Sequence, residues 1–214
     1  MKKKDEKWMR LALEIAERGA GYVSPNPMVG CVIVSDENKK IGQGYHERYG
    51  QDHAEKNAID SVRNPDQLDG ATVYVTLEPC AHHGNTPPCC ELLADLPVSR
   101  VVVAMEDPTP KVAGKGIQYL RDHDIEVDVG LLEDEAATLN EFFLHYQTHN
   151  RPFLTLKIAH TVDGYIAAPD GDSEWNTGPE SRALVHEWRS RYDAAMGGRN
   201  RDLLDTARLP VRTV

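Results

Sequence analysis

Three possible metal ligands constrain this chain more than any other feature. His53 begins a predicted helix, Cys80 follows a predicted strand, and Cys89 opens the next predicted helix. Zinc prefers nitrogen and sulfur ligands, and three protein ligands leave a fourth tetrahedral position for water, as in catalytic zinc sites. Glu55, two residues after His53, is placed to act as a base on that water. The chain must therefore adopt a fold that brings these segments together.

The order of these residues is that of the zinc-dependent nucleobase deaminases, in which a His-x-Glu precedes a Pro-Cys and a second Cys, and the Glu is not a ligand. The spacing departs from the generic signature, because eight residues separate Cys80 from Cys89 instead of two. The predicted chemistry is hydrolytic release of ammonia from a ring carbon, with Glu55 as the proton carrier. Cys31, inside an apolar run, and Cys90, out of register with the pattern, are expected to be structural.

Hydrophobic periodicity predicts an α/β domain before residue 148. The pattern indicates a mixed sheet with helices on both faces, and Cys80 falls at the carboxyl end of a strand, where such sheets bind ligands. The expected helices span 5–18, 53–63, 88–95, 114–123 and 132–146, and the expected strands span 29–34, 41–46, 71–77, 100–105 and 125–129.

A second αβ pattern follows, with strands expected at 153–159 and 165–168 and a helix at 180–192. We therefore expect two domains, 1–148 and 149–214. Only 64 residues lie beyond Asn150, which is few for an α/β domain with a core of its own.

Composition excludes several classes of protein. No apolar run is long enough to span a membrane, and no apolar core follows the basic N-terminus, so we expect a cytoplasmic protein. A formal net charge of −10 disfavours binding to nucleic acid. Four cysteines, two of them adjacent, suit a metal site better than a disulfide framework.

Four motifs make the chain resemble the bifunctional riboflavin-biosynthesis deaminase-reductases: PNPMVGCVIV (25–34), GQGYHERYGQDHAE (42–55), YVTLEPCAHHGNTPPC (74–89) and DPTPKVAGKG (107–116). The eight-residue insert between the two cysteines belongs to this family's pattern. The resemblance implies a cytidine-deaminase-like fold and a pyrimidine ribosyl phosphate as substrate. It also implies zinc on His53, Cys80 and Cys89, with Glu55 as the proton carrier.

The resemblance further places Asn26, His46 and His82 at the pyrimidine-phosphate site. At position 85 the family commonly has Lys or Arg, whereas this chain has Asn85. Recognition of the phosphate is therefore left open, with Lys111 and Lys115 as alternatives.

The segments 154–167 and 172–182 resemble the opening of that family's reductase domain, which is dihydrofolate-reductase-like and uses NADPH. The resemblance implies cofactor contacts from Ala159, Trp175 and Asp205, and substrate contacts from Lys157, Ser173, Arg189 and Arg212. We expect no competent reductase from this chain, because most of that sheet and the later glycine-rich phosphate segment are missing.

Two other functions stay open at this stage. One is deamination of a nucleoside or of a base in RNA, which the acidic balance and the insert disfavour. The other is a zinc-stabilised binding domain with Cys90, His82 or His83 as fourth ligand. Exposed strand edges would favour association, so a homo-oligomer is expected.

Overall fold

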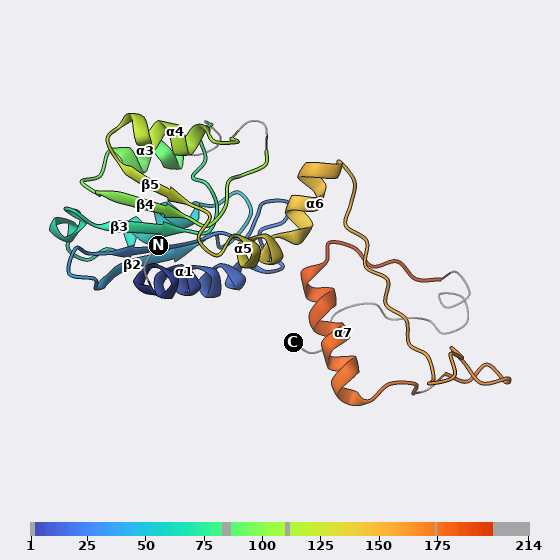
Figure 1. The fold of residues 1–214 in the computed structure, drawn as a ribbon. Coiled ribbons are helices and arrows are strands. Elements are labelled where there is room, and N and C mark those ends of the chain that lie inside the picture. The colour runs from blue at the N-terminus through green and yellow to red at the C-terminus, as the bar shows by residue number, and fades with distance from the viewer. Residues whose placement is uncertain (1–2, 83–86, 110–111, 174, 199–214) are drawn as a thin grey trace. The chain divides into compact units, whose positions relative to one another are not determined.

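The computed structural model describes residues 3–82, 87–109, 112–173 and 175–198. The chain divides into two compact units, with the boundary between Phe153 and Leu154. Figure 1 shows a layered first unit, from α1 to α6, and a second unit with the single labelled helix α7.

A five-stranded sheet in the order β2-β1-β3-β4-β5 forms the centre of the first unit. β1 pairs antiparallel with β2 and β3, whereas β3, β4 and β5 are parallel. The predicted mixed sheet is therefore confirmed. The strands are β1 (Gly30–Val34), β2 (Lys40–Tyr45), β3 (Thr72–Val75), β4 (Arg100–Val103) and β5 (Glu126–Val129).

Helices cover both faces of this sheet, as predicted (Figure 1). Successive side chains of a strand point to opposite faces, so the sheet has two buried layers. One layer contains Ile33, Val73 and Val101, and the other contains Val32, Tyr74 and Val102. The first packs against α2 (Ala54–Asp60), α3 (Cys89–Ala94) and α4 (Lys115–Asp122), and the second against α1 (Lys3–Ala16) and α5 (Glu133–Leu139).

The predicted continuous helix over 132–146 is wrong, because α5 ends before Asn140 and α6 (Glu141–His149) begins after it. The buried Asn140 side chain accepts a hydrogen bond from Met28 N at 2.8 Å and donates one to Met28 O at 2.9 Å. Asparagine is less favourable in helix interiors than at helix ends and turns, because its side chain competes for backbone hydrogen bonds. The break between α5 and α6 thus lies at a residue whose side chain binds Met28, 112 residues earlier in the sequence.

Close backbone contact presses α2 onto β2. A Cβ placed on Gly44 would lie 2.3 Å from Ala58 N and 2.7 Å from Ala54 O, so only glycine fits there. This contact fixes the start of α2, and with it His53, beside the sheet.

Among its described residues, the second unit has one helix, α7 (Pro179–Arg191), at the position predicted for 180–192. The predicted strands at 153–159 and 165–168 are wrong, because the described residues form no strand there. A strand exists only when its backbone pairs with a neighbour, and alternating apolar residues do not supply one. Across the described residues of both units, no helix is long and apolar enough to cross a membrane.

Candidate metal centre

His53, Cys80 and Cys89 converge at one edge of the sheet. His53 lies just before α2, Cys80 lies beyond the carboxyl end of β3, and Cys89 is the first residue of α3. Their ligand atoms all lie within 4.8 Å of one another. The Nδ1 atom of His53 is 3.5 Å from Cys80 Sγ and 3.3 Å from Cys89 Sγ. Three segments that are distant in sequence thus form one cluster.

These distances fit a tetrahedral zinc ion. Bonds of about 2.1 Å to nitrogen and 2.3 Å to sulfur put two tetrahedral ligands about 3.6 Å apart. The observed separations from His53 to the two sulfurs are close to that value. Two thiolates and one imidazole are also a donor set that zinc prefers.

The surroundings of Cys80 favour its thiolate. Cys89 N donates a hydrogen bond to Cys80 Sγ at 3.3 Å. Hydrogen bonding from the Cys89 thiol, followed by that from His53, lowers the pKa of Cys80 to about 4. A thiolate is the form that ligates metals.

Glu55 lies on α2 with 3% of its surface exposed. Burial, followed by the nearby charge of Cys80, raises the pKa of its carboxyl to about 7. Interaction with the Cys89 thiol opposes this rise in pKa.

His46 and Asn26 lie beside the cluster. His46 is buried, its ring is 5.5 Å from that of His53, and its Nε2 atom is 3.1 Å from Asn26 Nδ2. The Asp52 carbonyl, 3.0 Å from His46 Nδ1, only accepts, so Nδ1 carries the proton. Burial lowers the pKa of His46, which favours the neutral ring, and its Nε2 then accepts from Asn26.

Of the remaining residues predicted for this site, those that the structure describes are not part of the cluster. His82 is exposed, and Lys115 lies exposed at the start of α4. The ligand cluster among the described residues contains neither His82 nor Cys90. Cys90 is buried, as is Cys31, in agreement with a structural role. His83, Asn85 and Lys111 lie outside the described residues.

Sequence reasoning overlooked Glu78, whose buried carboxylate lies two residues before Cys80. An acidic residue at the end of an apolar run, directly before the Pro-Cys, was the signal that could have indicated it.

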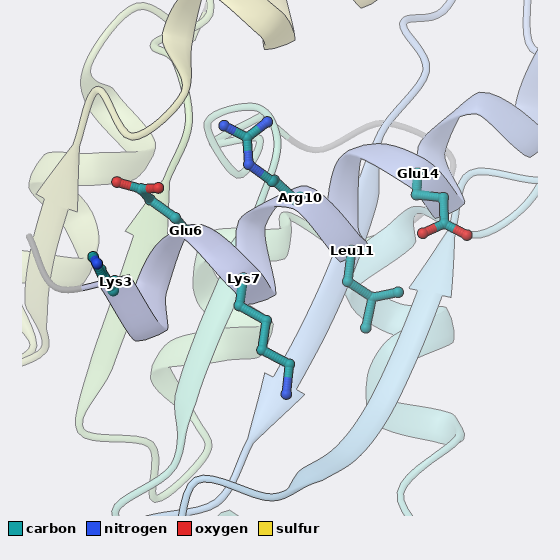
Figure 2. A pocket seen from close by; sticks show the side chains of 6 residues that line it. All are labelled: Lys3, Glu6, Lys7, Arg10, Leu11 and Glu14. Carbon is teal, nitrogen blue, oxygen red and sulfur yellow. The ribbon is translucent and has the colours of Figure 1, made fainter.

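An open hollow along α1 is lined by none of the residues of the metal cluster (Figure 2). One helix alone supplies its lining, which consists of Lys3, Glu6, Lys7, Arg10, Leu11 and Glu14. A second, polar hollow is lined by Glu47, Gly50, Gln51, Asp52 and Asn57, of which Asp52 directly precedes His53 in the sequence.

The residues predicted for a reductase site lie in the second unit. Lys157, Ser173 and Trp175 are exposed, whereas Ala159 and Arg189 are partly exposed. The Trp175 ring has the Arg182 guanidinium 4.4 Å from its centre. Asp205 and Arg212 lie outside the described residues. Neither hollow described above is lined by any of these residues.

Comparison with known proteins links both halves of the chain to one kind of protein. Residues 2–105 match the cytidine and deoxycytidylate deaminase zinc-binding region, and residues 152–214 match the RibD C-terminal domain. The riboflavin biosynthesis protein RibD of Aquifex aeolicus is 47% identical over 98% of this chain and 58% of its own length. RibD of Escherichia coli is 43% identical over 97% of this chain and 56% of its own length.

Solved structures give the same result. A diaminohydroxyphosphoribosylaminopyrimidine deaminase/5-amino-6-(5-phosphoribosylamino)uracil reductase from Thermotoga maritima is 45% identical, with a TM-score of 0.92. The match covers 98% of this chain and 59% of that one. RibD of Acinetobacter baumannii is 46% identical, also with a TM-score of 0.92, over 99% of this chain and 59% of its own. The chain thus spans somewhat more than half the length of the relatives it matches.

Proposed function

The chain belongs to the RibD family of riboflavin biosynthesis proteins, and from this premise we propose that its first unit is a zinc-dependent pyrimidine deaminase. The substrate is 2,5-diamino-6-(5-phosphoribosylamino)pyrimidin-4(3H)-one, and the products are 5-amino-6-(5-phosphoribosylamino)uracil and ammonia. The observation that carries this proposal is the cluster of His53, Cys80 and Cys89 with the buried Glu55 beside it.

Each member of the cluster has a separate task. His53, Cys80 and Cys89 would hold zinc, which when bound would supply a Lewis acid that lets water lose a proton near neutral pH. Glu55 takes that proton from water and delivers it to the ring nitrogen next to the reacting carbon. Glu55 then takes the second proton from the hydroxyl group now bonded to the carbon and delivers it to the amine, so that this hydroxyl becomes the carbonyl oxygen of the product. A C–O bond forms, the C–N bond breaks, and ammonia leaves.

Asn26 and His46 are proposed to orient the pyrimidine. The hydrogen bond from Asn26 to His46 Nε2, and that from His46 Nδ1 to the Asp52 carbonyl, leave the His46 ring and the Asn26 amide with little freedom to turn. A fixed pair of polar side chains beside the metal positions the amine-bearing carbon for attack. His82, in the loop between the two cysteines, is proposed to contact the substrate as well.

The family also carries out an NADPH-dependent reduction, to which the second unit corresponds. For this chain we propose a division into a deaminase domain, 1–148, and a portion of the reductase domain, 149–214. The absence of a competent reductase, the cytoplasmic location and the formation of homo-oligomers stay predictions.

A product assay tests the proposed deamination. Zinc-loaded protein is incubated with the diaminopyrimidine ribosyl phosphate, with and without NADPH, and products are identified by mass together with released ammonia. Cytidine and deoxycytidylate serve as comparison substrates. Of the three substrates, we expect only the diaminopyrimidine ribosyl phosphate to have one amine replaced by oxygen.

Two outcomes would change the proposal. Release of ammonia from none of these substrates by zinc-loaded protein would favour a structural zinc domain. Oxidation of NADPH that depends on the deaminated pyrimidine would show that the predicted lack of a reductase is wrong.

A further inference from the structure

Glu78 is a buried carboxylate whose side-chain hydrogen-bond partners, among the described residues, are backbone amides. Its side chain is almost fully enclosed, with 4% of the residue exposed. Its Oε2 atom accepts from Asp107 N at 3.2 Å and Gly114 N at 2.9 Å, and its Oε1 atom accepts from Gly116 N at 2.9 Å and Ile117 N at 3.3 Å. In the part of the chain that the structure describes, four donors and no acceptor meet this group, which suits an ionised carboxylate.

The four donors come from the two ends of one segment. Asp107 follows β4, whereas Gly114, Gly116 and Ile117 lie at the start of α4. One carboxylate therefore binds both ends of the segment that connects β4 to α4. It attaches these ends to the residues after β3, where Cys80 lies. Glu78 N also donates to Met105 O at 3.0 Å. The backbone and the side chain of Glu78 therefore both bind the residues that directly follow β4, Met105 and Asp107.

The backbone around Glu78 also packs directly against α4. A Cβ on Gly116 would lie 2.0 Å from the Pro79 carbonyl oxygen, so no side chain fits between the two segments. The residue after Pro79 is the ligand Cys80. α4 in turn packs on α3, which begins with the ligand Cys89. Glu78 thus binds the segment of Cys80 to α4, and α4 packs on α3, which begins with Cys89.

We propose that Glu78 is a positioning residue for the metal centre. It holds Cys80 at the separation from Cys89 and His53 that a tetrahedral ion requires, by fixing the Glu78–Cys80 segment against the first turn of α4. The inference rests on the zinc site of the proposed function and adds a residue that does not touch metal or substrate. Residues that do not bind a metal themselves often determine how well the residues that do bind it are oriented.

The same contacts exclude one site for the substrate phosphate. A glycine-containing turn at the start of a helix is an anion-binding arrangement, and the segment 113–116 has this form. The amides of Gly114, Gly116 and Ile117 already bind the carboxylate of Glu78. They are not available to the substrate.

The test compares Glu78→Gln with Asp5→Asn. Glutamine keeps the shape of Glu78 but turns one acceptor into a donor, which then faces backbone N–H groups. Asp5 is a matched control, because it is also 4% exposed and its carboxylate accepts from Tyr74 Oη at 2.8 Å and from Arg100 Nη1 at 3.1 Å. Arg100 is the first residue of β4, so it lies at the amino ends of the parallel strands, whereas Cys80 lies beyond the carboxyl end of β3.

Two readouts report on the metal centre without substrate: zinc affinity, by competition with a chelator, and the absorption bands of the cobalt(II)-substituted protein. We expect Glu78→Gln to lower zinc affinity by about 10- to 100-fold and to shift the cobalt bands. Asp5→Asn should lower the melting temperature while affinity and bands stay those of the wild type.

The outcomes separate the two proposals. Wild-type affinity and bands in folded Glu78→Gln would overturn the positioning role. If Glu78→Gln does not fold, Glu78→Asp takes its place: it keeps the charge but is too short to reach both pairs of donors, and wild-type behaviour there overturns the role equally. A wild-type protein whose cobalt spectrum shows no thiolate ligation would instead overturn the zinc site itself.

Discussion

The first unit and the second unit differ most in how far they bury their apolar side chains. The first has two buried layers, one on each face of its sheet. In the second, none of the described residues from 154 to 198 is buried, and Leu154 and Leu156 are 83% and 82% exposed. Apolar residues predict strands in both units, yet among the described residues only the first unit forms strands. A strand pattern needs neighbouring strands with which to pair.

The candidate sites differ in the same way. Three elements packed against one sheet bring His53, Cys80 and Cys89 within reach of a single ion. In the second unit, Ser173 and Trp175 lie outside any helix or strand and are exposed. A site made of distant residues thus depends on a packed sheet to hold it. The following four predictions test this contrast, from the largest expected effect to the smallest.

The largest effect is expected from Glu55→Gln. Loss of the proton carrier should reduce turnover of the pyrimidine by about 10²- to 10⁴-fold, while zinc content and melting temperature stay unchanged. The measurement is ammonia release by zinc-loaded protein. Trp175→Ala, in the second unit, is the control and should leave deamination unaffected. Equal losses in both variants would show that the deaminase site is not confined to the first unit.

The second prediction compares two leucines. Leu120 on α4 is fully buried, so Leu120→Ala should lower the free energy of unfolding by about 2–5 kcal/mol. Leu156 is 82% exposed, so Leu156→Ala should change it by no more than about 0.5 kcal/mol. Denaturant titration measures both values. A large loss for Leu156→Ala would mean that its side chain is covered in solution.

The third prediction concerns removal of the metal. Zinc at a concentration 100 times its dissociation constant stabilises the folded state by about 2.7 kcal/mol, and a chelator should remove that amount. Hydrogen exchange should then quicken in α2 and α3, which carry the ligands, and stay the same in α7. Faster exchange in α7 would argue against a metal effect confined to the first unit.

The smallest effect is expected at Asn140, where α5 ends. Asn140→Ala removes both hydrogen bonds to Met28 and should lower the free energy of unfolding by about 1–3 kcal/mol. In the second unit, Asn176 donates one exposed hydrogen bond to Ile166 O at 3.0 Å. Asn176→Ala should cost no more than about 0.5 kcal/mol. Similar losses from both would weaken the contrast between the units.

Much of the fold follows from local pattern. All five strands of the first unit and the helix α7 lie where periodicity predicts them, with ends that differ by a few residues. The proposed metal ligands were indicated by residue type and by their order in the chain, because few side chains suit zinc and the His-x-Glu and Pro-Cys pairs stand out in any sequence. The break at Asn140 and the role of Glu78 were not indicated, since each depends on backbone groups far away in the chain.

The sequence by itself thus determined which side chains are able to bind zinc, which residue is able to carry a proton, and which segments prefer helix or strand. Tertiary structure alone decided that three ligands meet at one sheet edge, that α5 stops at Asn140, and that residues 153–159 form no strand. The physical reason is the same in each case. Periodicity and residue type are local properties, whereas a metal site, a helix break and a strand each require a partner that another part of the chain must supply.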